Sequence, residues 1–152
     1  MSVEALPHFE LASPWSSTTR SSSRLQVVLD AEHADGGRCT LQVERCAGGR
    51  LEQAYPASVR DLEVQVSDLS DLELLPSVLT ATIAAVRTAD PRCRRIVYGA
   101  PRSDLMLVAG AEQAGFRYVV DVDLPDAELS VLVSEAEEVA QQDRALDVVP
   151  GS

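Results

Sequence analysis

Residues 66–79, VSDLSDLELLPSVL, lie where a predicted strand leads into a predicted helix. Before this stretch, apolar and polar residues alternate, as in a half-buried strand, with apolar Leu62, Val64 and Val66. After it, apolar residues recur at spacings of three and four, which predicts a helix from about Asp71 to Ala89. Ser70 and Glu73 fit a capping box at the helix start. Phosphate-binding turns at such junctions usually contain glycine, and this stretch contains none.

The elements around this junction indicate the fold class. Alternating or short apolar runs predict further strands at 24–33, 38–46, 95–101, 117–124 and 128–135, in addition to the one at 61–69. A second helix over 105–113 has Ser103 or Asp104 as its cap and ends at Gly115. This order predicts an α+β fold with a mixed, mostly antiparallel sheet of about six to seven strands flanked by helices.

The chain divides by composition into three parts. Residues 1–23 carry two prolines and the cluster SSTTRSSS, which is typical of a flexible N-terminal arm. Residues 24–135 form the predicted single domain, and residues 136–152 an acidic C-terminal helix or tail. With 152 residues, 45% of them hydrophobic, the chain has room for one sizeable core.

Charge and residue usage disfavour several classes of function. There are 24 acidic residues against 13 basic ones, a formal net charge of -11, so nucleic acid and anionic membranes are not expected partners. All basic residues are arginine, which excludes lysine-based covalent chemistry. The three cysteines suit a reducing cytoplasm rather than a disulfide framework. The two histidines are isolated, so no metal site is expected, and no apolar run predicts a membrane span.

Two stretches carry a resemblance to a known family. DLMLVAGAEQAGF at 104–116 is similar to the helix motif N-x-x-A-x-x-L-Y-E-K-x-G-F of the GNAT (Gcn5-related N-acetyltransferase) superfamily. VVDVDLPDAELSVLV at 119–133 resembles the closing hairpin of the siderophore-type acyltransferase branch. Together with the order of elements from residue 61 onward, these motifs extend the resemblance over about residues 24–135.

The resemblance implies an activity and a cofactor. Members transfer an acyl group from acetyl-CoA, or from another acyl thioester, to an amine, here a small amine. The cofactor's pyrophosphate lies on backbone N–H groups between the fourth strand and the next helix. The positions in this chain that would line the cofactor are Val64, Val66, Ser67 and Ser70.

The chain departs from the family pattern at the positions that matter for this activity. The family's phosphate-binding arginine falls on Asp71, and its three glycines fall on Leu72, Leu74 and Pro76. Its proton-donating tyrosine falls on Ala111. The alternative function is therefore a non-catalytic domain that has lost the pyrophosphate site, needs no cofactor, and acts as a binding or assembly module.

If the protein is an enzyme, the mechanism needs a general base near the amine. Glu63 is the first candidate and Asp104 the second; the alternative is that both are ordinary surface or capping carboxylates. Tyr98 or Tyr118 could replace the missing proton donor. The apolar pattern of the closing hairpin also fits a subunit interface, so the expected partners are a small amine, an unknown protein or a second copy of the chain.

Overall fold

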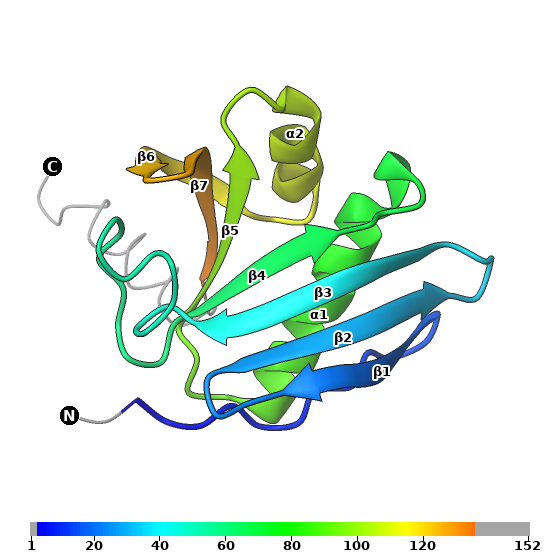
Figure 1. The fold of residues 1–152 in the computed structure, drawn as a ribbon. Coiled ribbons are helices and arrows are strands. Elements are labelled where there is room, and N and C mark those ends of the chain that lie inside the picture. Colours follow the sequence, from blue (N-terminus) through cyan, green and yellow to red (C-terminus); the bar gives the residue numbers. More distant parts are fainter. Residues whose placement is uncertain (1–2, 136–152) are drawn as a thin grey trace, which may run out of the picture.

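The computed structural model describes residues 3–135, so the predicted acidic segment at 136–152 lies outside the described part. A seven-stranded sheet has the order β1-β2-β3-β4-β5-β7-β6 (Figure 1). Only β4 and β5 pair in parallel; the other neighbours are antiparallel. The strands are β1 (Trp15–Ser22), β2 (Gln26–His33), β3 (Arg38–Arg45), β4 (Leu62–Ser67), β5 (Arg95–Pro101), β6 (Arg117–Leu124) and β7 (Ala127–Glu135). The predicted fold class is confirmed.

Both α-helices of the described chain, α1 (Leu75–Ala89) and α2 (Leu105–Gln113), pack on one face of the sheet. They share a core with the inward-facing residues of β2 to β5, such as Leu41, Val64 and Tyr98. By length and apolarity alone, 72–89 would qualify as a membrane span, contrary to the sequence prediction that no such run exists. In the structure this helix lies on the sheet, with Leu75, Val78, Leu79, Thr82, Ala85 and Val86 buried.

The start of α1 differs from the prediction. A 3-10 turn, Leu72–Leu74, precedes the helix, which begins at Leu75 with Pro76 in its first turn. The cap of the 3-10 turn is Asp71, whose carboxylate accepts the Glu73 N–H at 3.0 Å. The capping box of Ser70 and Glu73 is therefore wrong, because the Ser70 hydroxyl instead accepts the N–H of Arg38 at 2.9 Å. Proline suits this place because the first helical N–H groups have no partner within the helix.

Residues assigned to an arm by composition include a strand. β1 pairs antiparallel with β2 from Trp15–His33 to Ser22–Val27 and forms one edge of the sheet. Most of its side chains are exposed, so its serines and threonines carry no apolar alternation that would have predicted it. Before β1, Phe9 and Leu11 are buried in the core under α1, as is Trp15.

Part of the opposite face of the sheet, over β5 to β7, is covered by the segment that links β3 and β4, residues 46–61, which contains no helix or strand. Leu51 is fully buried there, against a second apolar cluster that includes Val97, Val131 and Val133. The loop thus takes the covering role on this face that α1 and α2 have on the other.

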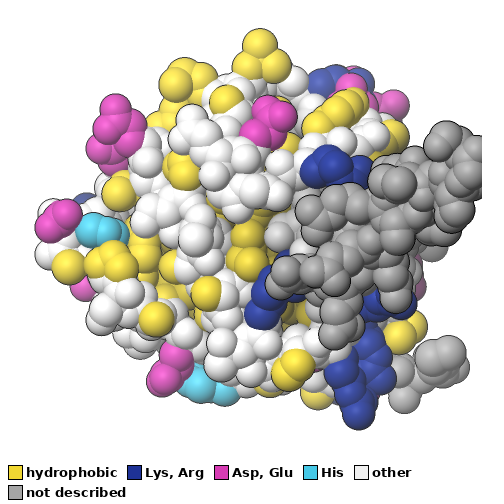
Figure 2. All heavy atoms as spheres, turned by 180° about the vertical axis from the view of Figure 1, so that it is seen from behind, with side chains coloured by type: hydrophobic (Ala, Val, Ile, Leu, Met, Phe, Trp, Pro, Cys, Tyr) yellow, Lys and Arg dark blue, Asp and Glu magenta, His cyan; other side chains and the backbone are white. Residues whose placement is uncertain are grey.

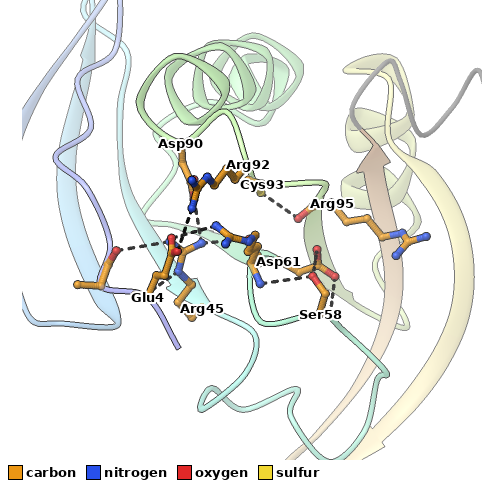
Figure 3. A network of polar contacts seen from close by, with 10 residues as sticks. Glu4, Arg45, Ser58, Asp61, Asp90, Arg92, Cys93 and Arg95 are labelled. Atoms are coloured by element: carbon orange, nitrogen blue, oxygen red, sulfur yellow. Dashed lines mark hydrogen bonds and ion pairs between the residues drawn. The ribbon is translucent and has the colours of Figure 1, made fainter. Parts of the chain in front are cut away.

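A buried arginine joins three parts of the chain beneath the end of α1. Arg45 is 1% exposed, and its guanidinium lies 2.8 Å from the Asp90 carboxylate at the end of that helix (Figure 3). It also donates to the carbonyl oxygens of Glu4 at 3.1 Å and Arg60 at 3.0 Å. Buried charges are stable only when paired and hydrogen-bonded, and these acceptors meet that requirement.

We expect Asp90→Asn to lower the free energy of unfolding by about 3–5 kcal/mol, because it leaves the Arg45 cation buried without its counter-charge. Urea unfolding measures the change. Asp30→Asn is the matched control, since its partner Arg20 is half exposed, and it should cost less than about 1 kcal/mol. Equal stability of Asp90→Asn and the wild type would contradict the role assigned to this pair.

Candidate functional site

The parallel strands β4 and β5 stay together for only part of their length. Their register holds at three pairs, from Leu62–Ile96 to Val64–Tyr98. Beyond that point β4 continues to pair with β3 as far as Ser67, while β5 pairs with β7 as far as Pro101. The facing backbone edges of Gln65–Ser67 and of 99–101 therefore separate. The backbone groups along these two edges are therefore not paired with each other in the sheet.

On the helix side, side chains of the protein pack close to this divergence. Leu75 and Ala111 are fully buried, and Tyr98 is 3% exposed. The helices α1 and α2 meet where Leu75 contacts Gly110: a Cβ at position 110 would lie 2.9 Å from Leu75 Cδ2. Only glycine allows this approach without displacement of Leu75.

In the turn between β4 and α1, backbone N–H groups form hydrogen bonds with acceptors of the same turn. The N–H of Glu73 bonds the Asp71 carboxylate, that of Leu74 bonds the Asp71 carbonyl at 2.9 Å, and that of Leu75 bonds the Leu72 carbonyl. Pro76 has no N–H. Four consecutive residues at the helix start therefore present no free backbone donor to a ligand.

Side chains also fill and charge this turn. Leu74 packs against Gly37 in the β2–β3 turn, where an added Cβ would fall 2.2 Å from Leu74 Cδ1. The exposed carboxylates of Asp68, Asp71 and Glu73 surround the helix start. They lie where the helix dipole would otherwise favour an external anion.

The four positions predicted to line a cofactor occupy different environments. Val64 is fully buried under α1 and Val66 is half-buried, while Ser67 and Ser70 are exposed. Val66 and Ser67 belong to the part of β4 that has separated from β5. Ser70 instead holds the turn to β3 through two hydrogen bonds with the Arg38 backbone, at 2.9 and 3.0 Å.

Glu63 lies on the opposite face of the sheet from the helices and is 1% exposed. Arg50, from the 46–61 segment, holds its carboxylate with Nη2 to Oε2 at 2.7 Å and Nε to Oε2 at 3.1 Å. Burial raises the pKa of Glu63 to about 7, although the bonded Arg50 opposes that rise. A carboxyl group that titrates near neutral pH has the acidity required of a general base.

Asp104 and Tyr98 come together on the other face. Asp104 caps α2, as predicted, by accepting the Leu107 N–H at 3.1 Å. Burial raises the pKa of Tyr98 to about 12, and the nearby Asp104 charge adds to the rise, so the phenol keeps its proton. The structure thus groups Asp104 with Tyr98 and separates both from Glu63, which points to the opposite face. Tyr118 lies further away, on the edge strand β6, and is exposed.

Two residues near Glu63 had not been identified from the sequence. Arg50 lies in a segment without periodicity, and Glu44 stands directly opposite Glu63 in the β3–β4 register. Only the strand alignment, which no local pattern specifies, could have indicated them. No helix precedes residue 72 in the described part of the chain.

No protein-family model and no curated protein matches the sequence. Solved structures do match the fold. An aminoglycoside acetyltransferase, AAC(6')-Ib, in complex with coenzyme A has a TM-score of 0.65 at 16% identity, over 78% of this chain and 70% of that one. RimJ from Mycobacterium smegmatis, in complex with CoA-disulfide, has a TM-score of 0.54 at 14% identity, over 88% and 77%. The spermidine N-acetyltransferase SpeG from Vibrio cholerae has a TM-score of 0.56 at 8% identity, over 80% and 70%.

These similarities establish the class of fold. The protein has the α+β fold of the GNAT superfamily, as the sequence resemblance predicted. The parallel β4–β5 pair that separates after Val64 lies between the antiparallel strands β1–β4 and the closing β6–β7 hairpin.

We expect Gly110→Ala to destabilise the protein by about 1 kcal/mol, because overpacking against Leu75 costs more than the gain in helix propensity. In a Leu75→Ala background the same substitution should become neutral or stabilising, since the space beside position 110 is then free. Thermal unfolding of the four proteins of this double-mutant cycle measures the coupling. Additive effects of the two substitutions would show that the helices do not meet at this point.

Proposed function

We propose that this GNAT-fold protein is a non-catalytic binding or assembly module that has lost the CoA pyrophosphate site. The proposal rests on the hydrogen bonds within the turn between β4 and α1. The N–H groups of Glu73, Leu74 and Leu75 all bond to acceptors in the turn itself, and Pro76, the next residue, has no N–H group. A pyrophosphate at a helix start depends on free backbone donors and close approach. Residues 73–76 of this turn supply no free backbone donor.

Electrostatics supports the same proposal. Like charges about 4 Å apart repel by about 1 kcal/mol in water, and by about 4 kcal/mol at an effective dielectric constant near 20. Asp68, Asp71 and Glu73 place three such charges beside any phosphate at this turn. The loss of the family's tyrosine at Ala111 removes a proton donor as well.

The surface offers apolar side chains for a module of this kind. Tyr118, Val119 and Val120 are exposed on the edge strand β6, and Leu105 and Met106 are exposed at the start of α2. Hydrophobic side chains gather at the top of Figure 2, over α2. Exposed apolar groups at a sheet edge favour contact with another protein or with a second copy of the chain.

Calorimetric titration with acetyl-CoA tests the loss of the pyrophosphate site. We expect no binding at millimolar ligand, with an active aminoglycoside acetyltransferase as the positive control. The double variant Asp71→Asn, Glu73→Gln should also fail to bind. Even without these two charges, the N–H groups of residues 73–75 remain bonded within the turn, and Pro76 still has none. Micromolar binding by the wild type would overturn the proposal.

The separation of β4 and β5 favours a second candidate function, an N-acyltransferase. Structural neighbours with this fold have been crystallised with coenzyme A and acetyl-CoA. In this candidate, Glu63 takes a proton from the ammonium group of a small amine. The free amine attacks the thioester carbonyl carbon, a C–N bond forms and the C–S bond breaks. The departing thiolate takes a proton from Tyr98, which lies near Asp104, and the proton lost by the new amide nitrogen restores the Tyr98 phenol.

For this candidate, Glu63→Gln should lower the rate of acyl transfer about 100-fold or more, because general-base catalysis contributes about that much. Release of free thiol from acyl thioesters, with a panel of small amines, measures the rate. Glu128→Gln is the matched control on an exposed strand position and should leave the rate unchanged. An unchanged rate in Glu63→Gln would remove the base assignment, and no transfer by the wild type from any thioester would remove the candidate.

A further inference from the structure

Two carboxylates meet beneath the 46–61 segment. Glu44 of β3 and Glu63 of β4 are direct partners in the antiparallel register and are 8% and 1% exposed. Gln26 of β2 donates to Glu44 at 3.2 Å, and Arg50 holds Glu63. Both carboxylates are therefore fixed on the face opposite α1, with little access to water.

The 46–61 segment closes directly over this pair. A Cβ at Gly49 would lie 3.1 Å from the Glu44 carboxylate, so the backbone of the segment rests on that group. Gly48, at φ +95°, makes the turn that brings this backbone down. Next to it, Arg50 reaches Glu63, and Leu51 is anchored in the second apolar cluster.

The charges around the pair do not balance if both carboxylates ionise. Arg50 is the cation bonded to Glu63, and its single charge faces two acidic groups. From the same segment, Cys46 has a thiol whose pKa is raised by burial, and Asp61 accepts two hydrogen bonds from Ser58. On β5 and β7 the contacts are Gly99 and Leu129, which bring no charge. Full ionisation would leave one buried negative charge without a counter-ion.

We propose that the 46–61 segment is a proton-controlled lid: Glu63, opposite the Glu44 carboxylate, holds a proton while the segment is closed, and loss of that proton opens it. The inference concerns the movement of this segment and does not depend on the proposed function. Opening would place Glu63 and Arg50 in water, where both charges are solvated.

The direction of the pH effect follows from linkage. Burial raises the pKa of Glu63 to about 7 in the closed state, and contact with water on opening would return it toward its ordinary value near 4.5. The closed state therefore binds the proton more tightly, and closure is favoured at low pH. As the pH rises from about 4.5 to about 7, the closed state loses stability relative to the open one.

Native-state hydrogen exchange of the full chain tests the lid. The amides of Glu52, Ala54 and Tyr55 make hydrogen bonds within the segment and report its opening. After correction for intrinsic exchange, their opening equilibrium should increase about 100-fold between pH 5 and pH 8, a factor of ten for each unit of pKa difference. Amides of the β2–β3 ladder serve as the internal reference and should not follow this change.

Variants separate the lid from general loosening. Glu63→Gln should abolish the pH dependence, and Glu44→Gln should move the transition to lower pH because it removes the opposing carboxylate. Leu51→Ala should increase opening equally at every pH, and Arg60→Gln, a segment arginine that pairs with Glu4, should change nothing. If Glu63→Gln does not fold, the pH midpoint of segment opening in Glu44→Gln still tests the lid. A wild-type segment whose opening is independent of pH, or a Glu44→Gln transition at the wild-type pH, would overturn the inference.

Discussion

The buried guanidinium of Arg45 fixes the framework on which the other features depend. It joins the N-terminal segment at Glu4, the backbone before β4 at Arg60, and the end of α1 at Asp90. A cation that is 1% exposed must keep all these acceptors, since an unmet charge in the core is very costly. The same contact therefore sets where α1 ends and keeps the N-terminal segment alongside the fold.

Because Arg45 holds the end of α1, the first turn of this helix lies beside the point where β4 separates from β5. This start carries Asp71, Leu74 and Pro76, on which the proposed loss of a phosphate site rests. The fold is that of acetyltransferases, whereas the residues of this turn favour the proposed non-catalytic module. Similarity to solved structures at 16% identity or less shows how the strands are arranged. Which ligand the turn binds depends on its backbone donors, and fold similarity does not specify them.

The two faces of the sheet also have different chemistry. The helix face is a packed apolar core with Tyr98 and Asp104 at its edge. The opposite face has a carboxylate pair and an arginine beneath an irregular segment. Glu63 was predicted from its place on β4, but the partners that set its pKa, Arg50 and Glu44, come from segments that are distant in sequence or register. No local pattern encodes such encounters.

Local patterns in the sequence were enough to predict most of the helices and strands. Apolar alternation and three-four spacing located β2 to β7, α1 and α2, and the missing glycines already indicated an unusual turn. Three features required the folded chain: the polar residues 15–22 form an edge strand, Ser70 bonds β3 rather than capping the helix, and Glu63 is buried against Arg50. The reason is physical: strand pairing, hydrogen-bond partners and desolvation depend on which distant residues meet.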